Sequence, residues 1–260
     1  MSRYSSMFDR LGGDGALGAF VMLGDPDVER SARLLADVVD AGADMIEVGI
    51  PFSDPVADGP VIQAAAQRAL TAGVRVDDCL ELIAGFRARY REVPVGILTY
   101  ANIVVARPGF ARDAAEAGAD SLLIADVPTL EAERFTRDMT QAGIEPVLIA
   151  AANTPERALQ RVATLSKAYT YCVSRTGITG THASGQFDKQ LIERLKQAGA
   201  APPIFGFGIS KPEHVRDALR AGARGVICGS AIVDLATTGG DVRGFVQSLK
   251  AATRNESAAQ

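Results

Sequence analysis

The stretch Ala41-Gly42-Ala43-Asp44-Met45-Ile46-Glu47-Val48-Gly49-Ile50-Pro51 decides the fold, because it recurs in degenerate form along the chain. Ala-Gly-Ala-Asp precedes the apolar run 121–128 and Ala-Gly-Ala-Arg precedes 225–230, while weaker copies precede 146–150 and 202–208. In each copy a helix can end on a glycine in the left-handed conformation, and a short run rich in Val, Ile and Leu follows. Such near-continuous apolar runs are typical of strands in parallel sheets that are buried on both faces.

Eight such strands are predicted, with amphipathic helical stretches between them. Two helices carry a clear start signal, in 153–156 and 210–213, where a capping side chain precedes a proline. A Rossmann or flavodoxin-like sheet usually needs only five or six strands, so eight strand–helix units favour a closed (β/α)8 barrel, the TIM barrel. The predicted strands lie at about 18–23, 43–50, 94–99, 120–125, 145–150, 168–173, 203–207 and 224–228.

The prediction is therefore an α/β protein with a single TIM-barrel domain over residues 1–260. It has a short extra N-terminal helix over about 1–11 and an extra helix after strand eight. The polar tail 254–260 is expected to be disordered.

Composition excludes several classes of function. A chain of 260 residues with 47% apolar residues can fill one core, and a net charge of −4 with mixed signs offers no basic face to nucleic acid. Two distant histidines and three cysteines without CxxC spacing match no metal site. The N-terminus lacks the apolar region of a signal peptide, and no apolar stretch approaches a membrane span, so a cytoplasmic protein is expected.

Glu47 is the most unusual residue, because a carboxylate interrupts an otherwise apolar strand. Burial raises the pKa of a carboxyl group, and a pKa near neutrality suits general acid–base catalysis. The structural alternative is an interior glutamate paired with a distant Lys or Arg. The next loop, 51–60, is stiffened by three prolines and carries Asp54 and Asp58 above the barrel mouth. Those aspartates could instead stabilise turns or cap the helix that begins near Pro60.

Two glycine turns predict a phosphate site. Strand seven ends in Phe205-Gly206-Phe207-Gly208-Ile209-Ser210, and strand eight ends in Cys228-Gly229-Ser230 before a short helix. TIM barrels commonly hold phosphate between these two loops and the N-terminus of such a helix. Glycines needed only for tight turns would not explain both locations. The glycine-punctuated segment 174–186 has the composition of a lid over substrate, or of a floppy surface loop, and His182 within it is expected to be solvated.

Residues 47–60 closely resemble the signature of the tryptophan synthase alpha subunit family. The segments 23–26, 174–180, 206–210 and 229–233 match the same family in the same order, so the resemblance covers roughly residues 3–250. Ala19 and Met22 depart from the family's usual Pro and Thr around the first-strand phenylalanine. Met22 shares the parity of Phe20 and is expected to face the barrel interior.

The resemblance implies a lyase of tryptophan biosynthesis. The family cleaves indole-3-glycerol phosphate to indole and glyceraldehyde 3-phosphate by a retro-aldol reaction, with no metal or organic cofactor in this chain. The expected partner is a beta subunit that carries pyridoxal phosphate, in an α2β2 heterotetramer. No nucleic-acid or membrane partner is expected.

The resemblance also implies roles for individual residues. Glu47 matches the glutamate that moves protons at the indole C3 and the glycerol hydroxyl, and Asp58 matches the aspartate that holds the indole N–H. The expected phosphate ligands are Gly180, Gly208, Gly229 and Ser230. The positions expected around the indole and glycerol parts are Phe20, Leu98, Tyr100, Leu123, Ile149, Tyr171, Thr179 and Phe207.

Two alternatives remain at this point. One is a standalone indole-3-glycerol phosphate lyase that releases free indole, which steady turnover without a partner would favour. The other is a degenerate barrel that serves as an allosteric binding subunit. The presence of Glu47, Asp58 and both glycine turns argues against this second alternative.

Overall fold

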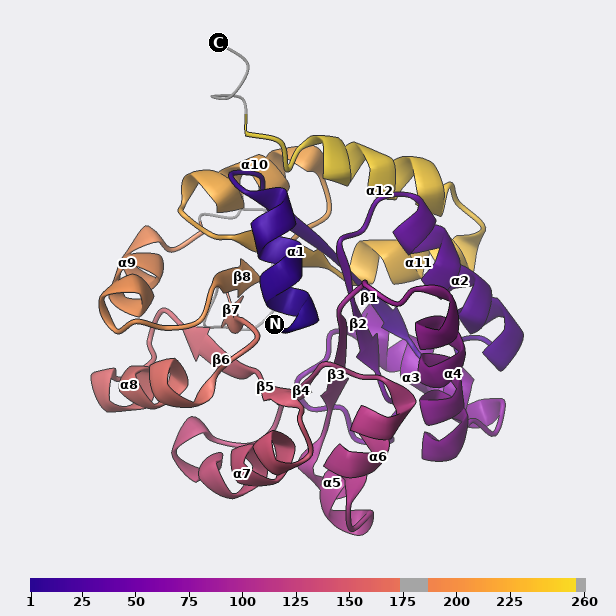
Figure 1. Cartoon of the computed structure of the whole chain (residues 1–260). Coiled ribbons are helices and arrows are strands. Elements are labelled where there is room, and N and C mark those ends of the chain that lie inside the picture. Colours follow the sequence, from indigo (N-terminus) through magenta and orange to yellow (C-terminus); the bar gives the residue numbers. More distant parts are fainter. Residues whose placement is uncertain (174–186, 256–260) are drawn as a thin grey trace.

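A computed structural model describes residues 1–173 and 187–255 of the chain as a ring of parallel strands enclosed by helices (Figure 1). The strand order is β5-β4-β3-β2-β1-β9-β8-β7-β6, and every pair is parallel. The predicted (β/α)8 barrel is therefore confirmed. The strands are β1 (Ala16–Met22), β2 (Met45–Gly49), β3 (Val95–Thr99), β4 (Ser121–Ile124), β5 (Glu145–Pro146), β6 (Leu148–Ala151), β7 (Thr170–Val173), β8 (Pro203–Phe205) and β9 (Gly225–Cys228).

The fifth predicted strand, 145–150, is divided into two short strands. β5 pairs with β4 and β6 pairs with β7, so the break at Val147 is the place where the ring closes. Pro146 has no N–H to donate to a neighbouring strand, which accounts for the interruption of the ladder. The Val147 N–H still reaches the carbonyl of Leu122 at 3.1 Å.

Helices follow the strands as the sequence predicts, including the two extra ones. The N-terminal helix spans residues 3–11, and another helix begins directly after β9. None of the helices in the described part of the chain has the length and apolar character of a membrane span. The helices are α1 (Arg3–Leu11), α2 (Val28–Asp40), α3 (Pro60–Thr71), α4 (Val76–Arg89), α5 (Ala101–Ala106), α6 (Phe110–Ala117), the 3-10 helix η1 (Thr129–Glu131), α7 (Glu133–Gln141), α8 (Glu156–Leu165), α9 (Lys189–Gln197), α10 (Pro212–Arg220), α11 (Ser230–Thr238) and α12 (Val242–Ala251).

The predicted side-chain caps of α8 and α10 are wrong, although Pro212 does open α10. The Thr154 hydroxyl accepts the N–H of Ala151 at 2.8 Å and so serves the preceding turn instead of α8. The Ser210 N–H lies 3.3 Å from Nδ1 of His214, and Lys211 occupies the cap position of α10.

The alternation of side chains along the strands creates two apolar layers. On β1, Leu17, Ala19 and Val21 pack outward against the helices. Phe20 and Met22 point into the barrel, which confirms the expected orientation of Met22. The inner layer is therefore built from one parity of each strand, and the cavity described below opens at its carboxyl end.

Helix α1 closes the opposite, amino-terminal end of the barrel, and Figure 1 shows it lying across the ring of strands. Tyr4 and Met7 of α1 are buried in the inner layer. The Tyr4 hydroxyl lies 2.8 Å from Oγ of Ser121, and its ring centroid lies 5.5 Å from that of Tyr169. Helix α1 thus fills the amino-terminal end of the barrel interior, and the catalytic cavity described below opens at the carboxyl end.

Candidate active site

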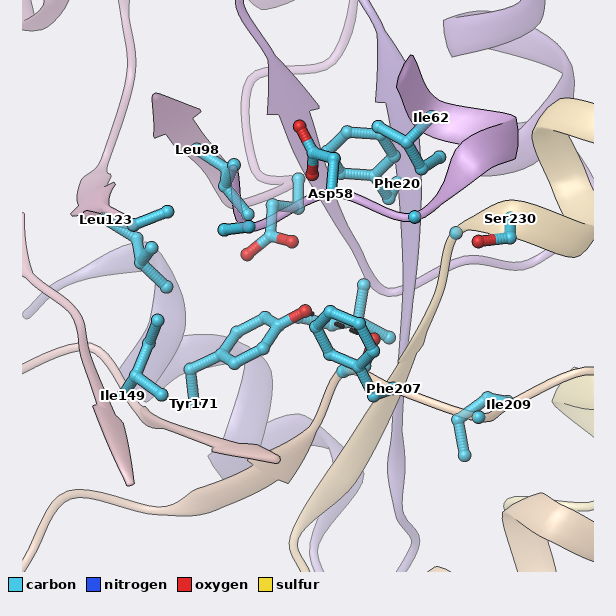
Figure 2. Close-up of a pocket in the computed structure, with 18 of the residues that line it drawn as sticks. Phe20, Asp58, Ile62, Leu98, Leu123, Ile149, Tyr171, Phe207, Ile209 and Ser230 are labelled. Atoms are coloured by element: carbon cyan, nitrogen blue, oxygen red, sulfur yellow. Dashed lines mark hydrogen bonds between the residues drawn. The ribbon is translucent and has the colours of Figure 1, made fainter. Parts of the chain in front are cut away.

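A cavity of about 210 Å³ opens at the carboxyl ends of the strands, where catalytic sites of this fold lie. In Figure 2, Asp58 and Phe20 lie on one side of it and Tyr171 and Phe207 on the other. Its lining residues are Phe20, Glu47, Ala57, Asp58, Gly59, Ile62, Leu98, Leu123, Ala125, Ile149, Tyr171, Gly206, Phe207, Gly208, Ile209, Ser210, Ile227, Gly229, Ser230 and Ala231.

Glu47 lies on β2 between Phe20 of β1 and Gly96 of β3, and it is only 1% exposed. Its Oε1 accepts a hydrogen bond from the Tyr169 hydroxyl at 2.7 Å. Among the described residues, Oε2 has no hydrogen-bond partner, and no Lys or Arg pairs with this carboxyl group. A buried carboxyl oxygen without a partner is costly for stability, so this geometry favours a catalytic role over a structural ion pair.

The pKa of Glu47 is raised to about 7. Burial is the main cause, because a low-dielectric interior disfavours the charged form. The hydrogen bond from Tyr169 lowers the pKa, and the nearby carboxyl group of Asp58 raises it. Near neutral pH, Glu47 therefore exists in both protonation states, and it can both give and accept a proton.

Asp58 is held in the loop after β2 by Tyr100, which follows β3. The Tyr100 hydroxyl donates to Oδ2 of Asp58 at 2.8 Å and accepts the N–H of Ala57 at 3.2 Å. The ring of Phe52 stacks on that of Tyr100 with centroids 5.2 Å apart. Burial raises the pKa of Asp58, and the hydrogen bond from Tyr100 lowers it. One tyrosine thus fixes both the loop and its carboxylate.

An apolar slot occupies one end of the cavity. The rings of Tyr171 and Phe207 meet edge to face, with centroids 6.4 Å apart and planes at 83°. The Tyr171 hydroxyl donates to the carbonyl of Gly206 at 3.1 Å, and a Cβ at Gly206 would lie only 2.0 Å from the ring. Glycine at this position therefore lets the tyrosine ring lie flat against the β8 loop. The aliphatic residues that complete the slot are Leu98, Leu123 and Ile149 (Figure 2).

Glycine turns and the start of α11 line the other end of the cavity, where Figure 2 places Ser230, and we call this end the anion cradle because its geometry suits an anion. Gly229 precedes the first turn of α11, and Gly208 has a φ of +79°, which glycine adopts without strain. The first N–H groups of a helix have no partner within the helix, and its dipole favours a negative charge there. No Lys, Arg or His is among the described residues that line the cavity, so the anion would be held by backbone donors.

The structure brings most of the predicted site residues into this one cavity. Tyr100 is not among its lining residues and instead lies behind Asp58. Thr179, Gly180 and the predicted lid 174–186 fall outside the described residues. Sequence reasoning missed Tyr169, although it shares the inward parity of Tyr171 in the same apolar run.

A closed parallel barrel with a buried carboxyl group of raised pKa, an apolar slot and glycine turns at a helix N-terminus is typical of enzymes of the phosphate-binding TIM-barrel class. Residues 10–259 match the profile of the family described as Tryptophan synthase alpha chain. The alpha chain of Vibrio cholerae serotype O1 is 45% identical over 267 residues, covering 98% of this chain and all of the relative. That of Corynebacterium efficiens is 44% identical, covering 90% of this chain and 86% of the relative.

Solved structures agree with the sequence relatives. A structure from Aquifex aeolicus has a TM-score of 0.91 at 34% identity, covering 98% of this chain and 100% of the other. Mycobacterium tuberculosis tryptophan synthase has a chain with a TM-score of 0.88 at 31% identity, covering 98% and 99%. The chain therefore belongs to the tryptophan synthase alpha chain family, as its motifs predicted.

Membership makes the chain a lyase of tryptophan biosynthesis that cleaves indole-3-glycerol phosphate to indole and glyceraldehyde 3-phosphate. In this family the pyridoxal phosphate belongs to the beta subunit and not to the alpha chain. The family match and the sequence relatives support the interpretation of this chain as an alpha subunit. They give no support to a standalone lyase or to a degenerate binding barrel.

Proposed function

We propose that Glu47 and Asp58 carry the cleavage reaction in the cavity at the carboxyl end of the barrel. The observation that carries this proposal is the buried Oε2 of Glu47, which has no hydrogen-bond partner among the described residues. The carboxyl group to which it belongs has a pKa raised to about 7. Glu47 delivers a proton to C3 of the indole and takes the proton of the glycerol hydroxyl attached to the carbon that leaves. The carbon–carbon bond then breaks, its electrons return to the indole ring, and the hydroxyl carbon becomes the aldehyde.

Asp58 stabilises the indole ring while C3 is protonated. Protonation at C3 places a positive charge on the ring nitrogen, and a carboxylate that accepts the ring N–H stabilises this charge. The hydrogen bond from Tyr100 favours the ionised form of Asp58 and fixes its orientation. The two carboxyl groups thus have different environments and different roles, which is a common arrangement for acid–base pairs.

The anion cradle holds the phosphate of the substrate. Gly208, Gly229 and Ser230 offer backbone N–H groups at the end of the cavity away from the apolar slot. With the indole in the slot and the phosphate in the cradle, the glycerol carbons cross the cavity floor near Glu47. The roles of Thr179 and Gly180 are proposed on the family resemblance alone.

The substitution Glu47→Gln tests the catalytic assignment. We expect it to keep the fold, because the side-chain shape is preserved, and to lower the rate of indole release by about 10²–10⁴-fold. The matched control is Glu145→Gln, a strand glutamate outside the cavity that also has a buried oxygen without a partner among the described residues. A Glu47→Gln enzyme with near wild-type turnover would assign Glu47 a structural role.

The beta subunit is the partner of this chain in the proposed α2β2 assembly. Three exposed apolar side chains lie along one side of the open end of the barrel, on the segments after the neighbouring strands β2, β3 and β4. They are Val56 at 80% exposure, Val105 at 61% and Leu130 at 48%. Apolar residues gathered on one face are typical of a protein interface, and here they suit a partner that receives indole. We place this assembly in the cytoplasm, in keeping with the absence of membrane-spanning helices from the described residues.

A further inference from the structure

A second cavity, of about 310 Å³, lies at the opposite end of the barrel from the catalytic site. It is bounded by α10, by the segments that lead into β1 and β9, and by the residues after α12. Gly15 directly precedes β1 and Arg224 directly precedes β9, so the cavity belongs to the amino-terminal end of the strands. A ligand here would leave the catalytic cavity free.

The lining of this cavity is strongly basic, although the whole chain has a net charge of −4. Four arginines line it, together with a single carboxylate, Asp14. Asp14 is engaged by the backbone, because its Oδ1 accepts the N–H of Asn255 at 2.8 Å. The arginines are Arg216, Arg220, Arg224 and Arg254.

The ion pairs of these arginines do not neutralise the cavity. Arg216 pairs with Glu213 at 3.1 Å and Arg220 with Asp217 at 3.2 Å, both between neighbours on the surface of α10. Those two carboxylates do not line the cavity. Exposed pairs of this kind contribute little stability, so their arginines remain available to a ligand. No ion pair of Arg254 occurs within the described part of the chain.

Arg224 gives the cavity a fixed donor. Its Nη2 donates to the carbonyl of Gly12 at 2.9 Å, and its guanidinium carbon lies 5.8 Å from the ring centroid of Phe8. Both contacts are with α1 or the residue that ends it, so the guanidinium is held in place before any ligand arrives. A pre-positioned donor reduces the entropy lost on binding.

We propose that this arginine cavity is a second anion site, which binds a small molecule bearing a phosphate or pyrophosphate group. Guanidinium groups present paired donors that match phosphate oxygens, and several of them around one cavity repel each other until an anion is bound. The site differs from the catalytic cradle in chemistry as well as place, because the cradle offers backbone N–H groups and this cavity offers charged side chains.

The test is calorimetric titration of inorganic pyrophosphate and inorganic phosphate into the full chain. The reference protein and every variant carry Ser230→Asp, which closes the catalytic cradle to anions, and the ionic strength is held constant. We expect one pyrophosphate per chain to bind this Ser230→Asp reference, and the added substitutions Arg220→Gln and Arg254→Gln to lower that affinity at least tenfold. The charge-matched control is Arg89→Gln with Arg112→Gln, two exposed arginines away from both cavities, which should leave the affinity within twofold.

Two results would overturn the proposal. If the Ser230→Asp reference binds no pyrophosphate, the arginine cavity is not an anion site. Equal loss of affinity in the control variant would show that binding depends on overall charge and not on this cavity. Thermal unfolding of each variant without ligand identifies any loss of fold, and the single variant Arg254→Gln, which removes an exposed side chain, repeats the test without disturbing α10.

Discussion

Glu47 has two neighbours that shift its pKa in opposite directions, Tyr169 through a hydrogen bond and Asp58 through its charge. Neither exceeds the effect of burial, which keeps the carboxyl group protonated to unusually high pH. Because a pKa that differs between the folded and unfolded states makes stability depend on pH, the raised pKa of Glu47 affects the free energy of unfolding as well as catalysis. The unfolded chain releases the proton of Glu47 near its ordinary pKa of 4.5, whereas the folded chain keeps it until about pH 7.

We therefore expect Glu47 to destabilise the fold increasingly as the pH rises from about 4.5 to about 7. Below this window both states are protonated and the effect vanishes. Above it, the cost is roughly 3 kcal/mol, since one pKa unit corresponds to about 1.4 kcal/mol. Glu47→Gln removes this cost, so its unfolding free energy should exceed that of the wild type by this amount at about pH 8 and match it at about pH 4. Urea unfolding at both pH values measures the difference. A constant difference between the two proteins would contradict the raised pKa.

Tyr169→Phe should shift the pH dependence of catalysis. Removing the hydroxyl removes a hydrogen bond that lowers the pKa of Glu47, so the pKa should rise further. The midpoint of the Glu47 step in the pH profile of kcat/KM should accordingly move to higher pH. Tyr4→Phe is the matched control, because the Tyr4 hydroxyl contacts Ser121 and not Glu47. If both variants shift the midpoint equally, the hydrogen bond is not the cause.

The sequence reveals a functional residue best when the chemistry of its side chain conflicts with the residues around it. Glu47 stands out because a carboxylate interrupts an apolar run, and Asp58 follows from the family motif. Tyr169 has no such conflict, since a tyrosine is ordinary in a buried strand. Its hydrogen bond joins residues 122 positions apart in sequence and is visible only once the barrel is closed.

Among the elements, α11 has the most direct connection to substrate binding, because its first residues line the cavity. Ser230→Asp places a negative charge at this helix N-terminus. We expect it to raise the KM for indole-3-glycerol phosphate at least tenfold by repulsion, whereas Ser230→Ala should be mild because the backbone donors remain. Steady-state kinetics of indole release measures both variants.

Ser248→Asp is the control for this pair, because it makes the same change on an exposed position of α12. It should leave the KM unchanged. A KM for Ser230→Asp equal to that of this control would mean that the phosphate is not held at α11.

The sequence predicts strands well and their interruptions poorly. Continuous apolar runs place every strand of the barrel, because burial on both faces leaves few alternatives, and a glycine motif before five of them supports the assignment. The division of the fifth strand depends on Pro146, whose effect appears only when its neighbours in the sheet are known. The predicted cap of α8 is wrong because the Thr154 hydroxyl accepts the N–H of Ala151 in the preceding turn, and that of α10 is wrong because Lys211, and not Ser210, occupies the cap position.

For the molecule as a whole, assembly with the beta subunit is expected to use the open face of the barrel. Val105→Asp, on an exposed position of α5, should lower the affinity for the beta subunit at least tenfold, because it buries a charge in an apolar interface. Cleavage by the isolated chain should be unaffected, because Val105 does not line the catalytic cavity. Titration of the beta subunit against the cleavage rate measures the affinity.

Ala84→Asp on α4 is the control for this surface, since residue 84 is exposed on the side of the barrel. It should leave the partner's affinity unchanged. Activation of Val105→Asp at the wild-type concentration of beta subunit would exclude this part of the open face as the interface.

The position of the catalytic cavity follows from the fold alone, because barrels of this class carry their sites at the carboxyl ends of the strands. The arginine cavity follows from no sequence pattern. Its four arginines belong to α10, to the residue before β9 and to the segment after α12, and none of them lies within a recognisable motif. Only the closure of the barrel, which brings the segment after α12 beside the start of β1, gathers them around one space.

The burial of α1 inside the end of the barrel has a consequence for the order of folding. Tyr4 contacts Ser121 and packs against Tyr169, so its binding site is made of strands that leave the ribosome long after α1 does. Until β4 and β7 have joined the sheet, the inner apolar layer that buries Tyr4 and Met7 is incomplete. We expect α1 to remain an exposed amphipathic segment during that time. We therefore expect the helix that is synthesised before every strand to be among the last to dock.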